Sequence, residues 1–403
     1  MNTNKIEKMD VKSGNRFAIL DTLRKKGAMS RKEISQEIGL TPAAVTNLTS
    51  ELIEEGIIRE VAEVDENRVG RKSILIDIDH KSYILIGVYI DITGIELTAT
   101  YLDGELIVRQ KKPLKDIAYH ENVTEKIAKE CKEFISDNIT LKRNEEKIVY
   151  IGLSIVGAVD EESGLSKGSF GILPQGEEIK ANLERKLRLP VAVENNVRAL
   201  AMAEIDFNNE EYIENALFIK HGPGVGSAII INRNIYRGST NVAGEIGHIY
   251  VKDNDKECIC GKKGCLETVI GESYIIDECK KVFSIENTNY LYNLCHANKD
   301  FINLHNILLA AENGDKQIKA ILDDALKYLA IAIDNTLQLI DVEEVILFGL
   351  AFQNNYFHKT FKKHLEDINS NRRYNIEYSN LNVDQEYKGC SAIASRSFLR
   401  MIS

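Results

Sequence analysis

The sequence predicts an α/β protein in which a winged helix-turn-helix domain is followed by a two-lobed α/β domain. Capped helices and a basic hairpin fill the first part of the chain, and beyond it strands alternate with helices in two sets. A length of 403 residues also exceeds one ordinary core. We therefore expect a winged helix domain at 1–78, a first lobe at 79–205 and a second lobe at 206–403, with a histidine- and cysteine-rich loop at 248–265.

Composition and charge restrict the classes of function. The chain has a net charge of -10, with 44% apolar and 28% charged residues, which is ordinary for a folded globular protein. A polar start and short apolar runs predict neither a signal peptide nor a membrane span, so we expect no membrane partner. Seven cysteines, several of them isolated, indicate reduced thiols in the cytoplasm. Residues 1–72 hold about 13 basic and 12 acidic side chains, so this end repels DNA least.

The amino-terminal part contains two helices in close succession. Apolar residues recur at helical spacing between Asn15, a candidate cap, and Gly27, where the first helix should stop. The segment SRKE then predicts a capping box, in which Ser30 and Glu33 bond each other's backbone amides. Gly39 is expected to end this second helix.

A third helix offers a face that suits a DNA groove. Thr41 is a helix cap and Pro42 takes the first helical position, where its missing N–H donor is harmless, and the helix is expected to run to Gly56. One face is apolar, and the opposite face carries small and polar side chains that could touch base edges in a major groove. The residues of this face are Ala43, Ala44, Thr46, Asn47 and Ser50.

A basic hairpin completes the winged helix-turn-helix pattern. IIREVAEV is strand-like, and a glycine turn with basic residues precedes a second strand. A three-helix bundle for protein contacts and a chance set of helices are the alternatives, but the basic wing and the lack of a large apolar patch favour DNA. The residues expected to contact DNA are Ser30, Arg31, Lys32, Thr41, Ala43, Ala44, Thr46, Asn47, Ser50, Arg68, Arg71 and Lys72.

The body of the chain alternates strands with helices. YILIGVYID, GIELTATYLD and GELIVRQKK are strand candidates before a helix at 123–139, and VYIGLSIVG and PVAVENN flank a helix around 179–187. A second set runs from ALFIKHG through a long helix at 316–339 to the strand VEEVILFG and a last helix. We expect two mixed sheets, which could be related halves, with a ligand cleft at the carboxyl ends of the strands.

The stretch GHIYVKDNDKECICGKKGCLE gathers one histidine and three cysteines. His248, Cys258, Cys260 and Cys265 are separated by nine, one and four residues, on a loop whose glycines allow the chain to turn around an ion. Three thiolates and an imidazole complete the tetrahedron that Zn²⁺ prefers, and a closed set of four ligands is typical of structural zinc. The alternative is an accidental or reactive group of thiols.

The same ion would orient His248 toward a cleft. If one imidazole nitrogen binds zinc, the other has a fixed direction and can donate a hydrogen bond. Glu245 lies three residues before this histidine, and Glu267 lies two residues after Cys265. Two carboxylates beside an imidazole suit a polyhydroxylated ligand.

Together these residues resemble the ROK family, which comprises repressors and sugar kinases with a two-lobed actin/hexokinase-like fold. The resemblance covers nearly the whole chain and rests on the winged helix followed by GRK, on VENNVRALAMAE, on GPGVGSAIIIN and on GEIGHIYVKDNDKECICGKKGCLE. It implies zinc at the four residues named above. It also implies sugar contacts at Asn195, Glu245, His248 and Glu267.

Departures from the family's kinases indicate a regulator without catalytic residues. Those kinases carry Glu-Asn-Asp where this chain has Glu194, Asn195 and Asn196, and an amide cannot act as the general base. Asn196 can still hydrogen-bond a sugar hydroxyl. The first phosphate loop, DITGIEL, lacks paired glycines, and FGLAF replaces a paired-glycine adenosine segment. GPGVGSA keeps the second phosphate loop.

We therefore predict a transcriptional repressor of a carbohydrate-related operon. It should bind double-stranded operator DNA as a homo-oligomer, a dimer or a tetramer, and respond to a sugar or sugar derivative in a degenerate, non-catalytic cleft. Two alternatives remain open. One is an active ROK sugar kinase with an appended DNA-binding domain, and the other is a regulator whose effector is a protein.

Overall fold

The computed structural model describes residues 11–64, 73–91, 94–113, 123–139, 147–168, 172–207, 213–342, 344–368 and 375–403. The chain forms two compact units. Unit 1 comprises Met1–Ile155, Val159–Glu194 and Tyr387–Ser403, and unit 2 comprises Val156–Ala158 and Asn195–Glu386. None of the helices in these described ranges has the length and apolar character of a membrane span.

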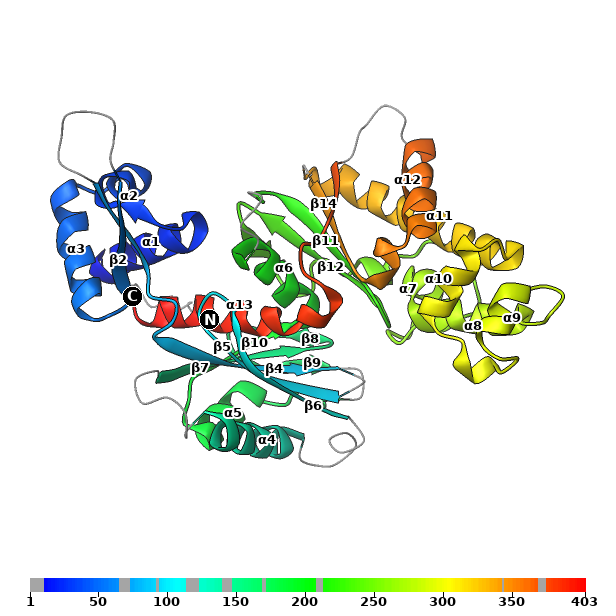
Figure 1. The fold of residues 1–403 in the computed structure, drawn as a ribbon, viewed down its shortest axis with the longest axis horizontal. Helices are drawn as coiled ribbons and strands as arrows, with labels where there is room; N and C mark the ends of the chain where they lie inside the picture. The colour runs from blue at the N-terminus through cyan, green and yellow to red at the C-terminus, as the bar shows by residue number, and fades with distance from the viewer. Residues whose placement is uncertain are drawn as a thin grey trace, which may run out of the picture. The chain divides into compact units, whose positions relative to one another are not determined.

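Unit 1 begins with the predicted winged helix-turn-helix domain (Figure 1). Its helices are α1 (Val11–Lys26), α2 (Arg31–Ile38) and α3 (Pro42–Glu54). A small sheet of order β1-β3-β2 follows, built from β1 (Met29–Ser30), β2 (Ile58–Val64) and β3 (Ser73–Ile78). The turn between β2 and β3, which carries Arg68, Arg71 and Lys72, lies outside the described residues.

The caps of α2 and α3 confirm the sequence prediction, whereas the start of α1 does not. The Ser30 hydroxyl accepts from the Glu33 amide, the Glu33 carboxylate accepts from the Ser30 amide, and Gly39 ends α2 at a φ of 69°. The helix α1, however, begins at Val11, so that Asn15 lies inside it rather than at its start. The residue after Asn15, Arg16, bonds the Glu55 carboxylate at the end of α3, a contact that the local cap signal does not reveal.

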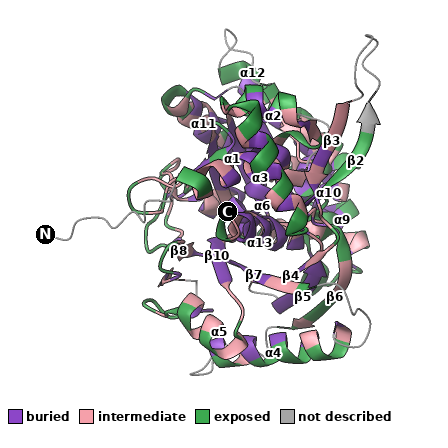
Figure 2. Ribbon diagram, turned by 90° about the vertical axis from the view of Figure 1, so that its left-hand side faces the viewer, coloured by how far each residue is buried: buried purple, intermediate pink, exposed green. Residues whose placement is uncertain are grey.

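The second part of unit 1 is a mixed five-stranded sheet of order β10-β7-β4-β5-β6. Helices α4 and α5 cover one face and α13 covers the other (Figure 1), and α13 and the strands other than the edge strand β6 are largely buried (Figure 2). Gly152 lets α13 approach closely, because a Cβ there would lie 2.0 Å from the Cys390 carbonyl oxygen. The elements are β4 (Tyr83–Ile90), β5 (Gly94–Thr100), β6 (Leu106–Pro113), α4 (Val123–Asn138), β7 (Lys147–Ile155), α5 (Ile179–Leu187), β10 (Val191–Asn195) and α13 (Tyr387–Met401), with a short pair β8 (Ala158–Val159) and β9 (Ser166–Gly168).

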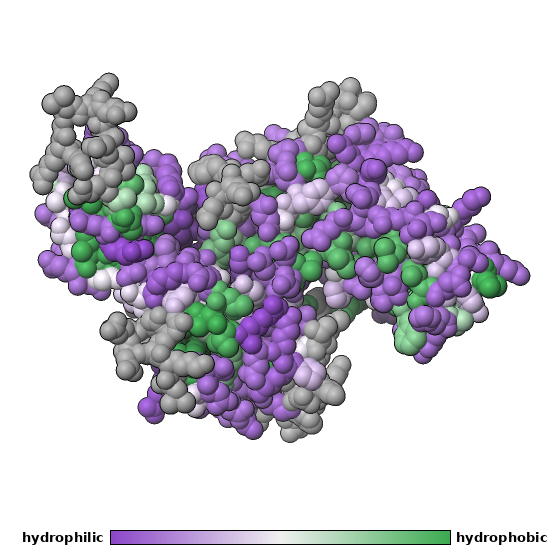
Figure 3. Space-filling view, viewed as in Figure 1, coloured by the Kyte–Doolittle hydropathy of each residue, from purple (hydrophilic) through white to green (hydrophobic). Residues whose placement is uncertain are grey.

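Unit 2 is built around a second mixed sheet, of order β13-β12-β11-β14-β15. Its strands are β11 (Ala216–His221), β12 (Val225–Ile231), β13 (Asn234–Tyr236), β14 (Glu344–Phe348) and β15 (Asn375–Tyr378). Its helices are α6 (Asn196–Phe207), α7 (Glu267–Ile270), α8 (Glu272–Val282), α9 (Asn289–Leu294), α10 (Leu304–Glu312), α11 (Lys316–Ile340) and α12 (Asn355–Ile368). Hydrophilic side chains dominate the visible surface over α11 and α12 (Figure 3), while their apolar faces enter the core of the unit.

The two sheets share one strand plan. In unit 1, β4, β5 and β6 are consecutive antiparallel strands and β7 pairs parallel with β4. In unit 2, β11, β12 and β13 repeat this order, and β14 pairs parallel with β11. This agrees with the expected pair of related halves. The second lobe was expected at 206–403, but its last helix, α13, belongs to unit 1.

Candidate functional site

The structure brings together the four cysteine and histidine side chains of the predicted zinc loop, within unit 2. A short 3₁₀ turn at Ile246–His248 presents the histidine, and Cys265 stands just before α7. Between them, Gly261 adopts a φ of 81° and donates its amide to the Cys258 carbonyl, 2.8 Å away, which closes the turn that holds Cys258 and Cys260. A left-handed glycine at this point allows two thiols to face the same small volume.

The donor atoms lie close together, and two of their distances match the edges of a tetrahedral metal site. The ligand atoms of His248, Cys258, Cys260 and Cys265 all lie within 4.8 Å of one another. The His248 Nδ1 to Cys258 Sγ distance is 3.4 Å, and the Cys260 Sγ to Cys265 Sγ distance is 3.6 Å. A tetrahedron with Zn–S bonds of about 2.3 Å and Zn–N bonds of about 2.0 Å has edges of about 3.5 to 3.8 Å between such atoms. The group could therefore hold a metal ion.

The second nitrogen of His248 faces away from the thiols. His248 Nε2 lies 3.8 Å from the Glu245 carboxylate, while Nδ1 is directed at Cys258. Glu267 also lies beside the metal group, with Oε1 3.8 Å from Cys258 Sγ. The predicted sugar contacts Glu245, His248 and Glu267 are thus neighbours in the structure.

Glu267 also holds the glycine-rich loop that follows β11. Its Oε2 accepts a hydrogen bond from the Val225 amide at 3.2 Å. A Cβ on Gly224 would lie 2.5 Å from the same oxygen, so a side chain at this position would displace the carboxylate. This second role was not apparent from the sequence, because the two segments are 42 residues apart.

The two predicted asparagines play different parts at the start of α6. The Asn195 side chain accepts from the amides of Val197 and Arg198 at 2.9 and 3.2 Å and donates to the Gly157 carbonyl at 2.9 Å, so it caps the helix. Asn196 is 7% exposed, and no side chain or backbone group among the described residues hydrogen-bonds its amide. The Asn196 amide can therefore hydrogen-bond a ligand, whereas the Asn195 amide is largely engaged in capping the helix.

A buried arginine ties α6 to the loop that leads to Glu245. Arg198 is 4% exposed, and its Nη1 donates to the Asn241 carbonyl at 2.9 Å. The helix that carries Asn196 and the segment that carries Glu245 are thereby joined. The sequence signal for this contact is weak, since an arginine in a helix is more often a surface residue.

The predicted reading face of α3 is exposed. Thr41, Ala43, Thr46, Asn47 and Ser50 are exposed and Ala44 is half-buried, whereas the apolar residues Val45, Leu48 and Leu52 are buried. The outward face of α3 is green and its inner face purple in Figure 2. The helix can therefore lie against another surface without losing its own core contacts.

Ser30 and Arg31 are engaged inside the domain, although the sequence placed both among the DNA contacts. Ser30 is 5% exposed, and its hydroxyl bonds Glu33 in the capping box. The Arg31 guanidinium donates to the Thr49 hydroxyl at 3.0 Å and pairs with Glu60 at 3.3 Å. Lys32, in contrast, is exposed. Arg31 thus fastens α2 to α3 and β2, a contact that helical spacing alone does not reveal.

Comparison with known proteins gives the same two-part organisation. A family profile described as "ROK family" matches residues 85–397, and one described as "Winged helix-turn-helix DNA-binding" matches residues 12–59. The chain is 26% identical over 375 residues to a protein named xylose repressor from Caldicellulosiruptor bescii, covering 93% of this chain and 92% of the relative. It is also 26% identical over 339 residues to the Escherichia coli protein named DNA-binding transcriptional dual regulator NagC, covering 84% and 81% of the two chains.

Solved structures show the same fold. A ROK family transcriptional regulator, described as a homolog of E. coli MLC protein, superposes with a TM-score of 0.80 at 22% identity, covering 97% of both chains. A ROK family glucokinase from Streptomyces griseus, in complex with glucose and AMPPNP, gives a TM-score of 0.66 at 23% identity, covering 77% of this chain and 99% of that chain.

Proposed function

The chain belongs to the ROK family, and on that premise we propose that it is a transcriptional repressor of a carbohydrate-related operon, controlled by a sugar or sugar derivative. The observation that carries this proposal is the exposed polar face of α3 in a capped winged helix domain fused to the ROK body. Relatives named as repressors, matched over most of their length, support it.

In this proposal two copies of α3 enter successive major grooves of a two-fold related operator. Half-sites must then lie about 34 Å apart or at a multiple of that distance, which requires a homo-oligomer, a dimer or a tetramer. Thr46, Asn47 and Ser50 would read base edges. Lys32, together with Arg68, Arg71 and Lys72 of the wing, would bind phosphate and position the helix.

The effector would bind beside the metal centre in unit 2. Asn196 offers an amide, Glu245 a carboxylate and His248 the nitrogen that does not face the thiols. Glu267 would contribute the carboxylate that also bonds Val225. Zn²⁺ at His248, Cys258, Cys260 and Cys265 would be structural, because four protein ligands leave no open coordination position. Its contribution is to fix the imidazole direction.

The competing function is a sugar kinase with an appended DNA-binding domain, because ROK kinases share the fold. Asn196 argues against the kinase function, because an amide cannot accept the proton of a sugar hydroxyl near neutral pH. A coupled phosphorylation assay with ATP and a panel of hexoses separates the two. We expect no turnover above background for the natural chain, and steady turnover would establish the kinase.

The direct test of the regulator is selection of bound fragments from a genomic DNA library, followed by a thermal shift panel of sugars and sugar phosphates. A ligand at 100 times its dissociation constant adds about 2.7 kcal/mol to the folded state, which such a panel detects. We expect enrichment of a two-fold related sequence and a stabilising sugar. If DNA is enriched but no carbohydrate shifts the melting temperature, the effector is a protein instead.

A further inference from the structure

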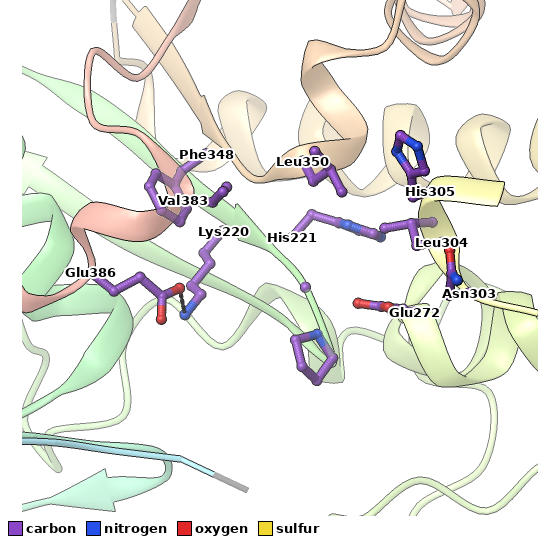
Figure 4. Close-up of a pocket in the computed structure, with 12 residues that line it drawn as sticks. Lys220, His221, Glu272, Asn303, Leu304, His305, Phe348, Leu350, Val383 and Glu386 are labelled. Carbon is purple, nitrogen blue, oxygen red and sulfur yellow. Dashed lines mark ion pairs between the residues drawn. The ribbon is translucent and has the colours of Figure 1, made fainter. Parts of the chain in front are cut away.

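A cavity of about 360 Å³ lies within unit 2 at the end of β11. None of the proposed zinc or sugar residues lines it. Its titratable lining residues are Lys220 and His221 on β11, Glu272 on α8, His305 on α10 and Glu386, and Asn303 adds an amide (Figure 4). The volume falls in the range of pockets that hold small organic molecules.

The only lysine of the cavity is already neutralised. Lys220 Nζ lies 2.5 Å from Glu386 Oε1, and the two side chains are only 11% and 19% exposed. Glu272 then adds a second carboxylate to the lining. Because recognition of a phosphate depends on cationic groups aimed at it, a pocket with one paired cation and an additional carboxylate repels phosphorylated ligands.

His221 lines this cavity as an uncharged side chain. The residue is 3% exposed, and its Nε2 lies 2.8 Å from the Ile270 carbonyl, so Nε2 carries the proton that this contact needs. Nδ1 then holds a lone pair, and it has no hydrogen-bond partner among the residues that the structure describes. Burial lowers the pKa of His221 to about 4, so the ring is neutral at pH 7 and Nδ1 stays an acceptor.

Glu272 supplies another acceptor without a partner. Its backbone amide donates to the Gly222 carbonyl at 3.2 Å, which fixes the residue beside the glycine-rich loop. No group in the described ranges forms an ion pair or hydrogen bond with its carboxylate, and burial raises the pKa of this carboxyl. Leu350 and Val383, 41% and 42% exposed, provide an apolar wall to the same cavity.

We propose that this cavity binds a small organic amine, as a ligand distinct from the sugar effector. The ammonium group forms an ion pair with the Glu272 carboxylate, and the carbon skeleton packs on Leu350 and Val383. The Glu272 carboxylate, which has no partner among the described residues, is thereby neutralised. The proposal does not depend on the assignment of the sugar site.

Three probes of one shape and different charge test this proposal on the full-length protein at pH 7. Dissociation constants of benzylamine, benzyl alcohol and benzoate are measured by ligand-observed NMR. Benzylamine should bind at least about 10-fold more tightly than benzoate, because the Glu272 carboxylate attracts a cation and repels an anion. Benzyl alcohol should fall between them. If benzoate or AMPPNP binds as tightly as benzylamine, or no probe binds, the proposal is overturned.

A pair of variants then locates the binding site. Glu272→Gln should weaken the binding of benzylamine about 10-fold or more and change the binding of benzyl alcohol far less. Only the ammonium group loses an ionic partner in this variant. Glu286→Gln, at an exposed position outside the cavity, is the control and should leave both affinities unchanged. Unaltered melting temperatures show that both variants are folded. Equal benzylamine affinity in wild type and Glu272→Gln would assign the amine to another place.

Discussion

Arg16 of α1 donates two hydrogen bonds, of 2.8 and 2.6 Å, to the carboxylate of Glu55, the residue that ends α3. Its Nη2 also donates to the carbonyl of Ile402, just beyond α13, at 3.1 Å. One guanidinium therefore holds both the helix proposed to read DNA and the carboxyl-terminal end of the chain. The planar fork of arginine suits this, since lysine cannot make the paired contact.

We predict that Arg16→Met lowers both stability and operator affinity. Arg16 is 8% exposed, so the loss of a paired contact to a carboxylate should reduce the free energy of unfolding by about 1 to 3 kcal/mol, with the lower end favoured because Glu55 is half exposed. Without the contact, α3 is less firmly placed. Urea unfolding and fluorescence anisotropy with selected DNA measure the two effects.

The matched control is Lys12→Met, which removes the neighbouring ion pair to Glu51. Both partners there are well exposed, at 58% and 40% of the side chain, so we expect a change within about 0.5 kcal/mol. Equal losses in the two variants would mean that Arg16 has no special part in placing α3.

Replacing Asn47 should change which DNA sequence is preferred. The side chain is exposed on α3, and a base-edge contact of an amide is worth about 1 to 3 kcal/mol of discrimination. Asn47→Ala is therefore expected to relax base preference at one position of each half-site. Anisotropy titrations against a set of single-base operator variants give the result.

Lys72→Ala serves as the comparison for Asn47→Ala. A phosphate contact carries no sequence information, so this variant should weaken all operator variants alike and reduce the salt dependence of binding. Uniform losses for both variants across the operator set would contradict the assignment of α3 as the reading helix.

Metal content should follow the cysteine cluster. Elemental analysis of the purified chain is expected to give one zinc per chain, and Cys260→Ser should lose it and melt several degrees lower, because metal binding to such a site contributes directly to folding. Cys295→Ala is the control, since this buried thiol lies outside the cluster and should affect packing without changing the zinc content. A natural chain that contains no zinc would refute the structural role of the metal.

Stability should fall in acid partly through His221. Burial lowers the pKa of this imidazole to about 4, whereas in the unfolded chain it titrates near its ordinary value of 6.5. Below about pH 6.5 the imidazole is therefore protonated in the unfolded state but stays neutral in the folded state. The free energy of unfolding falls as pH approaches 4, by up to about 3 kcal/mol. Urea midpoints at pH 7, 6 and 5 should fall less steeply for His221→Gln than for the natural chain.

Local signals in the sequence were sufficient for most helix ends and strands. The capping box of Ser30 and Glu33 and the Pro42 start of α3 determine helix ends through contacts within a few residues, and apolar runs mark the strands of both sheets. The metal group was also predictable, because short loop spacing forces its four side chains together. Such features need no knowledge of the tertiary fold.

Contacts between distant segments could not be read in the same way. The start of α1, the inward role of Arg31 and the placement of α13 all depend on partners far along the chain. The Glu267 contact to Val225 and the pairing of Lys220 with Glu386 are further examples. A residue pattern shows which side chains can act chemically, but a single sequence does not show which of them are used to join elements.

The central claim is that sugar binding in unit 2 and DNA binding by α3 are coupled in one molecule. The most direct measurement is the dissociation constant of the stabilising sugar, taken by calorimetry with and without saturating operator DNA. Linkage requires that bound DNA lower the affinity for the sugar by the same factor by which bound sugar lowers the affinity for DNA. This factor is about 5 to 150 for typical coupling. We predict matching factors in this range, whereas one and the same sugar affinity in both titrations would contradict the account.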